Sequence, residues 1–155
     1  MKGNEQIIAQ LNKLLTSELT AIDIYFVQSR ILQNKGYMKL FEQLDHEMTD
    51  EQGHATKLIE RIIFLEGEPN IHDRLSFKVT ASVKEMYEMD LAYELENKEI
   101  LKEIIQLCYE HHDFGTKDVI EPLLIDTEED HIDWLETQLS IIKDIGEDKY
   151  LAEKI

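Results

Sequence analysis

Two copies of the pattern Glu-x-x-His constrain this chain more than any other feature of its sequence. The copies are residues 51–54 and 128–131, and Glu18 and Glu94 precede them by 33 and 34 positions. Residues three apart lie on the same face of an α-helix, so each copy aims a carboxylate oxygen and an imidazole nitrogen at one point. If four helices turned these faces inward, four glutamates and two histidines would converge. These residues are Glu18, Glu51, His54, Glu94, Glu128 and His131.

Composition and hydrophobic spacing both predict an all-α fold. The 155 residues include only 6 Gly and 2 Pro, and strong helix formers dominate. A chain of this length forms a single domain over residues 1–155 with a substantial core. Apolar residues recur at intervals of three and four, which predicts long helices over about 5–34, 37–65, 82–110 and 116–145. The remaining tail suits a short fifth helix.

Glycine and proline mark where the predicted helices end. Gly36 follows the first helix, Gly67 follows the second and Gly146 ends the fourth. Residues 70–81 show no helical period, so we expect a long crossover that lets the second and third helices run parallel. Pro122 lies inside the fourth helix, where a π-bulge or a kink near it would absorb the extra residue of the second spacing.

The motif residues fall on the apolar stripes of their helices. Glu18, for example, lies between Leu15 and Ile22. Carboxylates are almost never buried unless they are paired or bind a metal, and no lysine or arginine shares these stripes. A single Glu-x-x-His is usually a surface pair, but two inward copies with matched upstream glutamates favour a metal site.

We therefore expect a dinuclear metal site. Oxygen ligands with two imidazoles suit iron or manganese better than zinc. In this interpretation Glu51 and Glu128 bridge the metals, His54 and His131 each hold one, and the remaining two glutamates are terminal. Neighbouring side chains are candidates for supporting contacts: Tyr25, Trp134 and Asp90, the last as a hydrogen-bond acceptor for a metal-bound histidine.

Charge excludes several classes of partner. Acidic residues outnumber basic ones 33 to 16, for a formal net charge of −17. Such a surface repels nucleic acid and anionic lipid and attracts cations. No apolar run approaches the length of a membrane span, and the first residues lack the apolar core of a signal peptide, so we expect a cytoplasmic protein. The single Cys108 fits a small buried apolar residue.

With these motifs in view, the chain resembles the bacterioferritins of the ferritin-like superfamily over essentially its whole length. Three further stretches carry the resemblance: Met-Lys-Gly at 1–3, Arg-Ile-Ile-Phe-Leu-Glu-Gly-Glu-Pro-Asn at 61–70 and His-Ile-Asp-Trp-Leu-Glu at 131–136. The resemblance implies a four-helix bundle with the long crossover and a hollow cage of twenty-four subunits. It also implies a ferroxidase function, in which a di-iron centre in each subunit oxidises Fe(II) with oxygen or peroxide and the mineral is stored inside.

The resemblance assigns roles to individual residues. The six motif residues match the family's ferroxidase ligands, and His46 with Asp50 matches its inner-surface iron site. Haem is the exception, because the family's haem-binding methionine is replaced by Gln52. A carboxamide cannot replace a thioether on haem iron, and Met48 lies one turn, about 5 Å, away along the helix.

The chain thus resembles the branch without the haem methionine, and we expect a homomer without haem b. Such chains can co-assemble with a haem-binding sister chain, and a ferredoxin-type reductant would release the iron. Three alternatives are weaker. A rubrerythrin-like peroxidase or manganese catalase is one, but rubrerythrins usually add a Cys-x-x-Cys module and this chain has one cysteine. A vestigial assembly module would have lost ligands, and a DNA-coating mini-ferritin builds its site between subunits.

Overall fold

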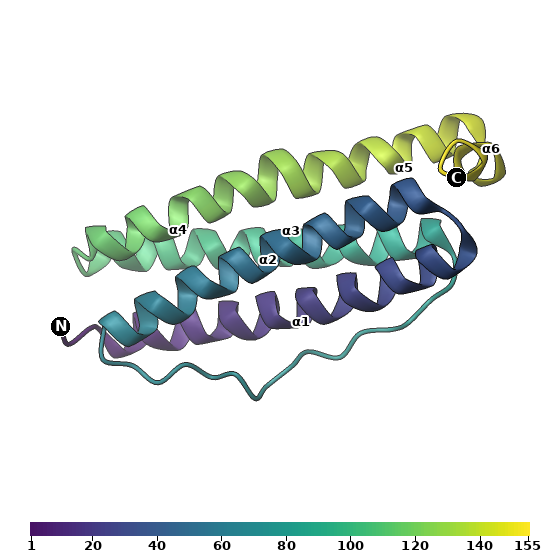
Figure 1. Ribbon diagram of the computed structural model, residues 1–155. Helices are drawn as coiled ribbons and strands as arrows, with labels where there is room; N and C mark the ends of the chain where they lie inside the picture. The colour runs from purple at the N-terminus through teal and green to yellow at the C-terminus, as the bar shows by residue number, and fades with distance from the viewer.

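In the computed structural model, which describes all 155 residues, the chain forms an all-α bundle (Figure 1). The helical elements are α1 (Glu5–Lys35), α2 (Met38–Phe64), α3 (Val83–Glu110), α4 (Phe114–Asp126), the π-helix η1 (Thr127–Ile132), α5 (Asp133–Ile145) and α6 (Glu147–Ala152). Elements α4, η1 and α5 follow one another without a break and form the fourth long helix of the bundle. The predicted fold class is confirmed. None of the helices combines the length and the apolarity needed to cross a membrane.

Local sequence sets the ends of these helices. At the start of α1, Asn4 accepts hydrogen bonds from the backbone N–H groups of Gln6 and Ile7, at 2.9 and 3.2 Å, and so satisfies donors that the first turn leaves free. Gly36 ends α1 with a left-handed φ of 85°, as its position in the sequence predicts. Gly146, with a φ of 87°, separates α5 from α6, and α6 turns across the end of the bundle (Figure 1).

The segment between α2 and α3 runs along the outside of the bundle from one end to the other (Figure 1). Hydrogen bonds hold it against α1. The backbone N–H of Asn70 donates to Asn12 Oδ1 at 2.8 Å, and that of Leu75 donates to Thr20 Oγ1 at 2.9 Å. Because the crossover returns the chain to the end where α2 began, α2 and α3 run parallel, as predicted.

The core consists of two apolar clusters with a polar layer between them. In α1, Glu18 lies between Leu15 of one cluster and Ala21 of the other. The other buried polar side chains of this layer are Glu47, Glu51, His54, Asp90, Glu94, Asn97, Thr127 and His131. Packing of the two apolar clusters therefore fixes the height along the bundle at which these side chains meet.

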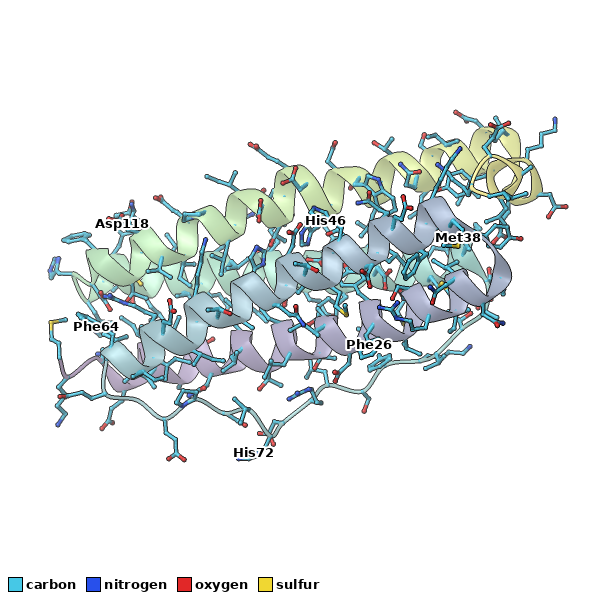
Figure 2. All side chains as sticks on the ribbon, viewed as in Figure 1. Phe26, Met38, His46, Phe64, His72 and Asp118 are labelled. Carbon is cyan, nitrogen blue, oxygen red and sulfur yellow. The ribbon has the colours of Figure 1, made fainter.

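The helical spacing of apolar residues predicts both Tyr25 and Phe26 on the inward stripe of the first helix, and for Phe26 this prediction is wrong. Phe26 is 53% exposed, whereas Tyr25 beside it is 2% exposed, and Figure 2 shows Phe26 on the outer side of α1. Adjacent residues on a helix cannot both face the same way. Tyr25 takes the inward position and leaves Phe26 on the surface.

The irregularity expected near Pro122 lies further along the chain. Helix α4 continues through Pro122, and the extra residue is absorbed in η1. Backbone hydrogen bonds of a π-helix span five residues in place of four. Residues three apart in η1 therefore no longer share a face, and the second copy of Glu-x-x-His lies in this segment.

Candidate metal centre

The first copy of the motif has the geometry that an α-helix predicts. Glu51 Oε2 lies 3.5 Å from His54 Nδ1, and the two residues are 1% and 5% exposed. Glu18 from α1 completes the group, with its Oε2 atom 3.8 Å from the same Nδ1. These three side chains offer ligand atoms that lie within 4.8 Å of one another.

Glu51 also belongs to a second group, with Glu94 of α3 and His131 of η1. Nδ1 of His131 is 3.0 Å from Glu51 Oε1 and 3.3 Å from Glu94 Oε1. The rings of His54 and His131 are stacked, with centroids 5.8 Å apart. Glu51 thus presents one carboxylate oxygen to each histidine, as a ligand shared by two cations would.

Several buried oxygens of this cluster lack a hydrogen-bond donor. Glu18 Oε2, Glu51 Oε2 and Glu94 Oε2 have no such partner. The only ion-pair partners of these three residues, through either carboxylate oxygen, are the two histidines. Removing a carboxylate from water without compensation is costly. Three carboxylates and two imidazoles that converge in this way fit a pair of divalent cations such as iron or manganese.

Proximity also changes the protonation of the cluster. Burial lowers the pKa of His131, but hydrogen bonds and charge attraction from Glu51 and Glu94 outweigh burial and raise it to about 12. Burial and repulsion from Glu51 raise the pKa of Glu94. Without a metal ion, the imidazolium of His131 supplies the positive charge that the carboxylates need. A metal cation would take over that role and displace the proton.

Hydrogen bonds from uncharged side chains orient the terminal carboxylates. The Tyr25 hydroxyl donates to Glu94 Oε1 at 2.8 Å, and the Asn97 amide donates to Glu18 Oε1 at 3.4 Å. Ser17 in turn donates to Asn97. Each carboxylate therefore keeps its Oε2 atom free for a cation. The predicted contact of Tyr25 with the site is confirmed.

Asp90 does not support a histidine, so that prediction is wrong. Its carboxylate accepts a hydrogen bond from the Gln28 amide at 2.8 Å, because its position one turn before Glu94 faces α1. The outer nitrogen of His54 contacts Asp126 instead, with Nε2 and Oδ2 2.9 Å apart.

Trp134 packs edge-on against Tyr87, with ring centroids 5.3 Å apart. It also lines a small cavity beside the site.

Glu128 does not join the cluster. Its side chain is exposed on the outer face of η1, whereas Thr127 and His131 are buried. The wider turn of the π-helix keeps His131 on the inner face and rotates Glu128 outward. The structure therefore does not bring Glu128 to the cluster, because the rule that residues three apart share a face applies to α-helices.

Sequence reasoning missed Glu47, although a signal was present. Glu47 is 7% exposed, and its Oε2 atom lies 3.0 Å from His131 Nε2. It precedes Glu51 by four positions and so shares its helix face. His46 and Asp50, which the resemblance pairs, do lie together, with Nε2 and Oδ2 3.4 Å apart.

The residues considered for haem binding point in different directions. Gln52 is exposed on α2, on a different face from Glu51. Met48 is partly buried and packs against the second apolar cluster. The structure therefore leaves Gln52 at the surface. It brings five of the six motif residues into one cluster, which Glu47 also joins.

The chain is similar to known proteins over nearly its whole length. The profile of the ferritin-like domain matches residues 8–145. A protein named bacterial ferritin from Synechocystis sp. is 45% identical over 100% of this chain and 99% of its own length. A bacterial ferritin from Pseudomonas aeruginosa is 43% identical over all of both chains. A bacterioferritin from Mycolicibacterium paratuberculosis is 40% identical over 99% of this chain and 96% of its own.

Proposed function

Because this chain belongs to the ferritin family, in its bacterial ferritin branch, we propose that its buried cluster is a ferroxidase centre that oxidises Fe(II) for storage. One observation carries the proposal: Glu51 faces both histidines, and each histidine belongs to a group of three ligands. Fe(II) is the substrate, and two ions held side by side each give up one electron to dioxygen or peroxide.

Each side chain of the cluster has a distinct role in binding the two ions. Glu51 holds the two positions at a constant separation, since its two oxygens face different histidines. Glu18 and Glu94 neutralise the charge of the incoming ions. Tyr25 keeps one oxygen of Glu94 occupied, which orients the other toward the site. His131, whose pKa the neighbouring carboxylates raise to about 12, must release a proton before its ring nitrogen can bind a cation.

Stoichiometry and rate test this proposal together. We expect two Fe(II) ions per chain to be oxidised in a fast phase when air is admitted. Glu18→Ala combined with Glu94→Ala should abolish that phase, because it removes a terminal ligand from each group of three. The matched control is Glu60→Ala with Glu103→Ala, which removes the same charge from exposed positions. A double variant that oxidises iron as fast as the control would refute the assignment. Manganese as the preferred metal would appear as selective Mn(II) uptake.

We also propose that the chain assembles into a cage of twenty-four subunits, with or without a haem-binding sister chain. This cage would store the mineral inside and receive electrons from a ferredoxin-type reductant. Large apolar side chains on the surface support assembly, among them Phe26, Phe64 and Phe114, each at least 50% exposed. The mass of the protein from its native source, with its subunit composition, tests this proposal.

Within that cage, His46 and Asp50 would form an iron site on the inner surface. The homomer would carry no stoichiometric haem, because Gln52 offers a carboxamide where a thioether is needed. Gln52→Met should then confer haem binding between subunits. A strong haem absorption band in the unmodified homomer would contradict this part of the proposal.

A further inference from the structure

We propose that Gln28 and Asp90 form an uncharged acid–amide pair that holds Tyr25 against Glu94, which makes Asp90 a positioning residue of the metal centre. The pair joins α1 to α3 beside the cluster, and neither of its members offers a ligand to the two groups that share Glu51. Its role rests on the proposed function, because the pair acts on the centre only through Tyr25 and Glu94.

Two hydrogen bonds cross from α1 to α3 at this level of the bundle. The Tyr25 hydroxyl donates to Glu94 Oε1 and the Gln28 amide donates to Asp90 Oδ1, both at 2.8 Å. The two donors are three apart on α1 and the two acceptors are four apart on α3, so each pair lies on one helix face. All four side chains are at most 3% exposed. Two contacts about one turn apart fix the rotation of α1 against α3.

The contact between Gln28 and Asp90 leaves one oxygen of each side chain without a donor. These atoms are Gln28 Oε1 and Asp90 Oδ2, and both are buried. An ionised carboxylate offers only acceptors, whereas a protonated one carries an O–H donor. A proton on Asp90 Oδ2 supplies the donor that is missing, and the oxygen of the same Gln28 amide is the acceptor that needs it. An acid and an amide joined in both directions leave neither oxygen unpaired.

The surroundings of Asp90 favour the protonated form. Asp90 is 1% exposed, and the charged groups that act on it are Glu94 of its own helix and Glu47 of α2. Burial raises the pKa of Asp90 and repulsion from these two carboxylates raises it further, which together outweigh the hydrogen bond from Gln28. A buried carboxylate without a positive partner is costly. The proton therefore lets the pair form without adding a negative charge beside Glu94.

The pair affects the centre through the orientation of Glu94. Tyr25 occupies Glu94 Oε1, and Oε2 of the same carboxylate has no donor and remains for a cation. If the Gln28–Asp90 contact were lost, α1 could shift against α3, the Tyr25 hydrogen bond would lengthen and Glu94 could rotate. Loss of the pair should therefore weaken cation binding as well as lower stability.

Substitutions of Asp90 distinguish a neutral pair from a charged one. Asp90→Asn keeps the shape of a protonated acid and can still pair with Gln28, so it should bind Co(II) as the unmodified protein does. Asp90→Leu removes the pair, so it should weaken binding of one of the two Co(II) ions about tenfold, the lower end of the range for residues that support a ligand. The absorption spectrum of bound Co(II) should change with it. Binding by Asp90→Asn as weak as that by Asp90→Leu would overturn the proposal.

Gln138→Leu is the matched control for a purely structural loss. It removes another buried hydrogen bond, in which the Tyr150 hydroxyl donates to Gln138 Oε1 at 2.7 Å, and neither residue belongs to the metal cluster. This variant should have a lower melting temperature but the Co(II) affinity and spectrum of the unmodified protein. If Asp90→Leu matched the control in affinity and spectrum, the pair would have no positioning role.

Infrared spectra test the proton on Asp90 directly, and they decide the matter even if Asp90→Leu does not fold. Because bound Co(II) ionises the carboxyls that hold it, the Co(II)-loaded unmodified protein should show a carboxylic acid band that Asp90→Asn lacks. Identical carboxylic acid bands in the two proteins would mean that Asp90 is ionised and would overturn the proposal. An unmodified protein that bound no pair of Co(II) ions would refute the dinuclear centre instead, and the same comparison of the metal-free proteins would still test the pair.

Discussion

The two copies of Glu-x-x-His are identical in spacing but lie in different kinds of helix. In α2, Glu51 and His54 face the same cluster, 3.5 Å apart. In η1, His131 faces the cluster and Glu128 faces away from it. The comparison shows that residues three apart share a helix face when the helix has α-helical hydrogen bonding. In a π-helix the same spacing does not predict a shared face.

The position of the π turn decides which side chain faces the cluster. In the structure the turn begins at Thr127, and Thr127 is buried at 1% exposure in the inward place. Had the extra residue been absorbed earlier, near Pro122, the residues between Pro122 and the present π turn would have rotated and Glu128 would have faced inward. The difference between the two copies therefore comes from one residue of helix length.

The largest expected effect follows from exchanging the glutamate of each copy for alanine. Glu51→Ala should weaken Co(II) binding by more than about 100-fold, because even residues that only support a ligand contribute 10- to 100-fold and Glu51 faces both histidines. Glu128→Ala should change the affinity by no more than about threefold, since its side chain is exposed. Competition with a coloured chelator measures both.

Equal losses of Co(II) affinity in Glu51→Ala and Glu128→Ala would contradict the difference between the two copies. That result would mean that the π turn moves when metal binds and brings Glu128 into the site. Glu129→Ala, which alters an exposed neighbour of Glu128, controls for the general loss of acidic charge.

Much of the fold and five residues of the cluster could be predicted from the sequence. The four long helices and the group formed by Glu18, Glu51 and His54 depend on α-helical periodicity, which the chain obeys in these helices everywhere except η1. The crossover follows from the absence of that periodicity over residues 70–81. The direction in which Glu128 faces could not be predicted. The spacing shows that the fourth long helix contains one extra residue, but it does not show at which turn the helix accommodates that residue. Glu47 was on the inward stripe, yet one buried glutamate among many acidic residues carries little signal.

A second effect concerns protons. Since burial lowers the pKa of His131 but Glu51 and Glu94 raise it to about 12, the ring stays protonated at neutral pH and must lose a proton to bind a cation. Co(II) affinity should therefore rise at least about tenfold per pH unit between about pH 6 and about pH 8. Affinity measured across this range gives the slope. His131→Gln should flatten it, and an unchanged slope in that variant would contradict the protonation assigned to His131.

The same shift predicts the stability of the metal-free protein. A folded-state pKa above the unfolded value of about 6.5 gives stability that is complete below that pH and is lost as pH rises toward about 12. With a chelator present, the melting temperature should fall as pH rises from about 6 to about 8. His131→Gln should lose less stability over that range than the unmodified protein.

A third effect comes from making the second copy resemble the first. Deleting Thr127 removes the extra residue, so the π turn should become α-helical while α4 and α5 keep their places. The residue that is now Glu128 would then occupy the buried position of Thr127 and add a carboxylate to the site. Co(II) affinity should increase about tenfold, the equivalent of about 1.4 kcal/mol. Thr127→Ala, which keeps the chain length, should leave the affinity unchanged, and a deletion variant no tighter than this control would show that the π turn does not cause the difference.

The smallest effect on metal binding is expected from Pro122, the other irregular feature of the fourth long helix. Pro122 lies inside α4 and is exposed, so it removes one backbone hydrogen bond without filling the core. Pro122→Ala should stabilise the fold by about 1–3 kcal/mol, measured as a rise in melting temperature, yet leave Co(II) affinity as it was. The number of residues, rather than the proline, forces the chain to widen a turn, so η1 should persist in this variant. If Pro122→Ala instead changed the affinity as much as the deletion of Thr127 does, the proline would be the cause of the π turn, and the difference between the two copies would depend on a single ring rather than on helix length.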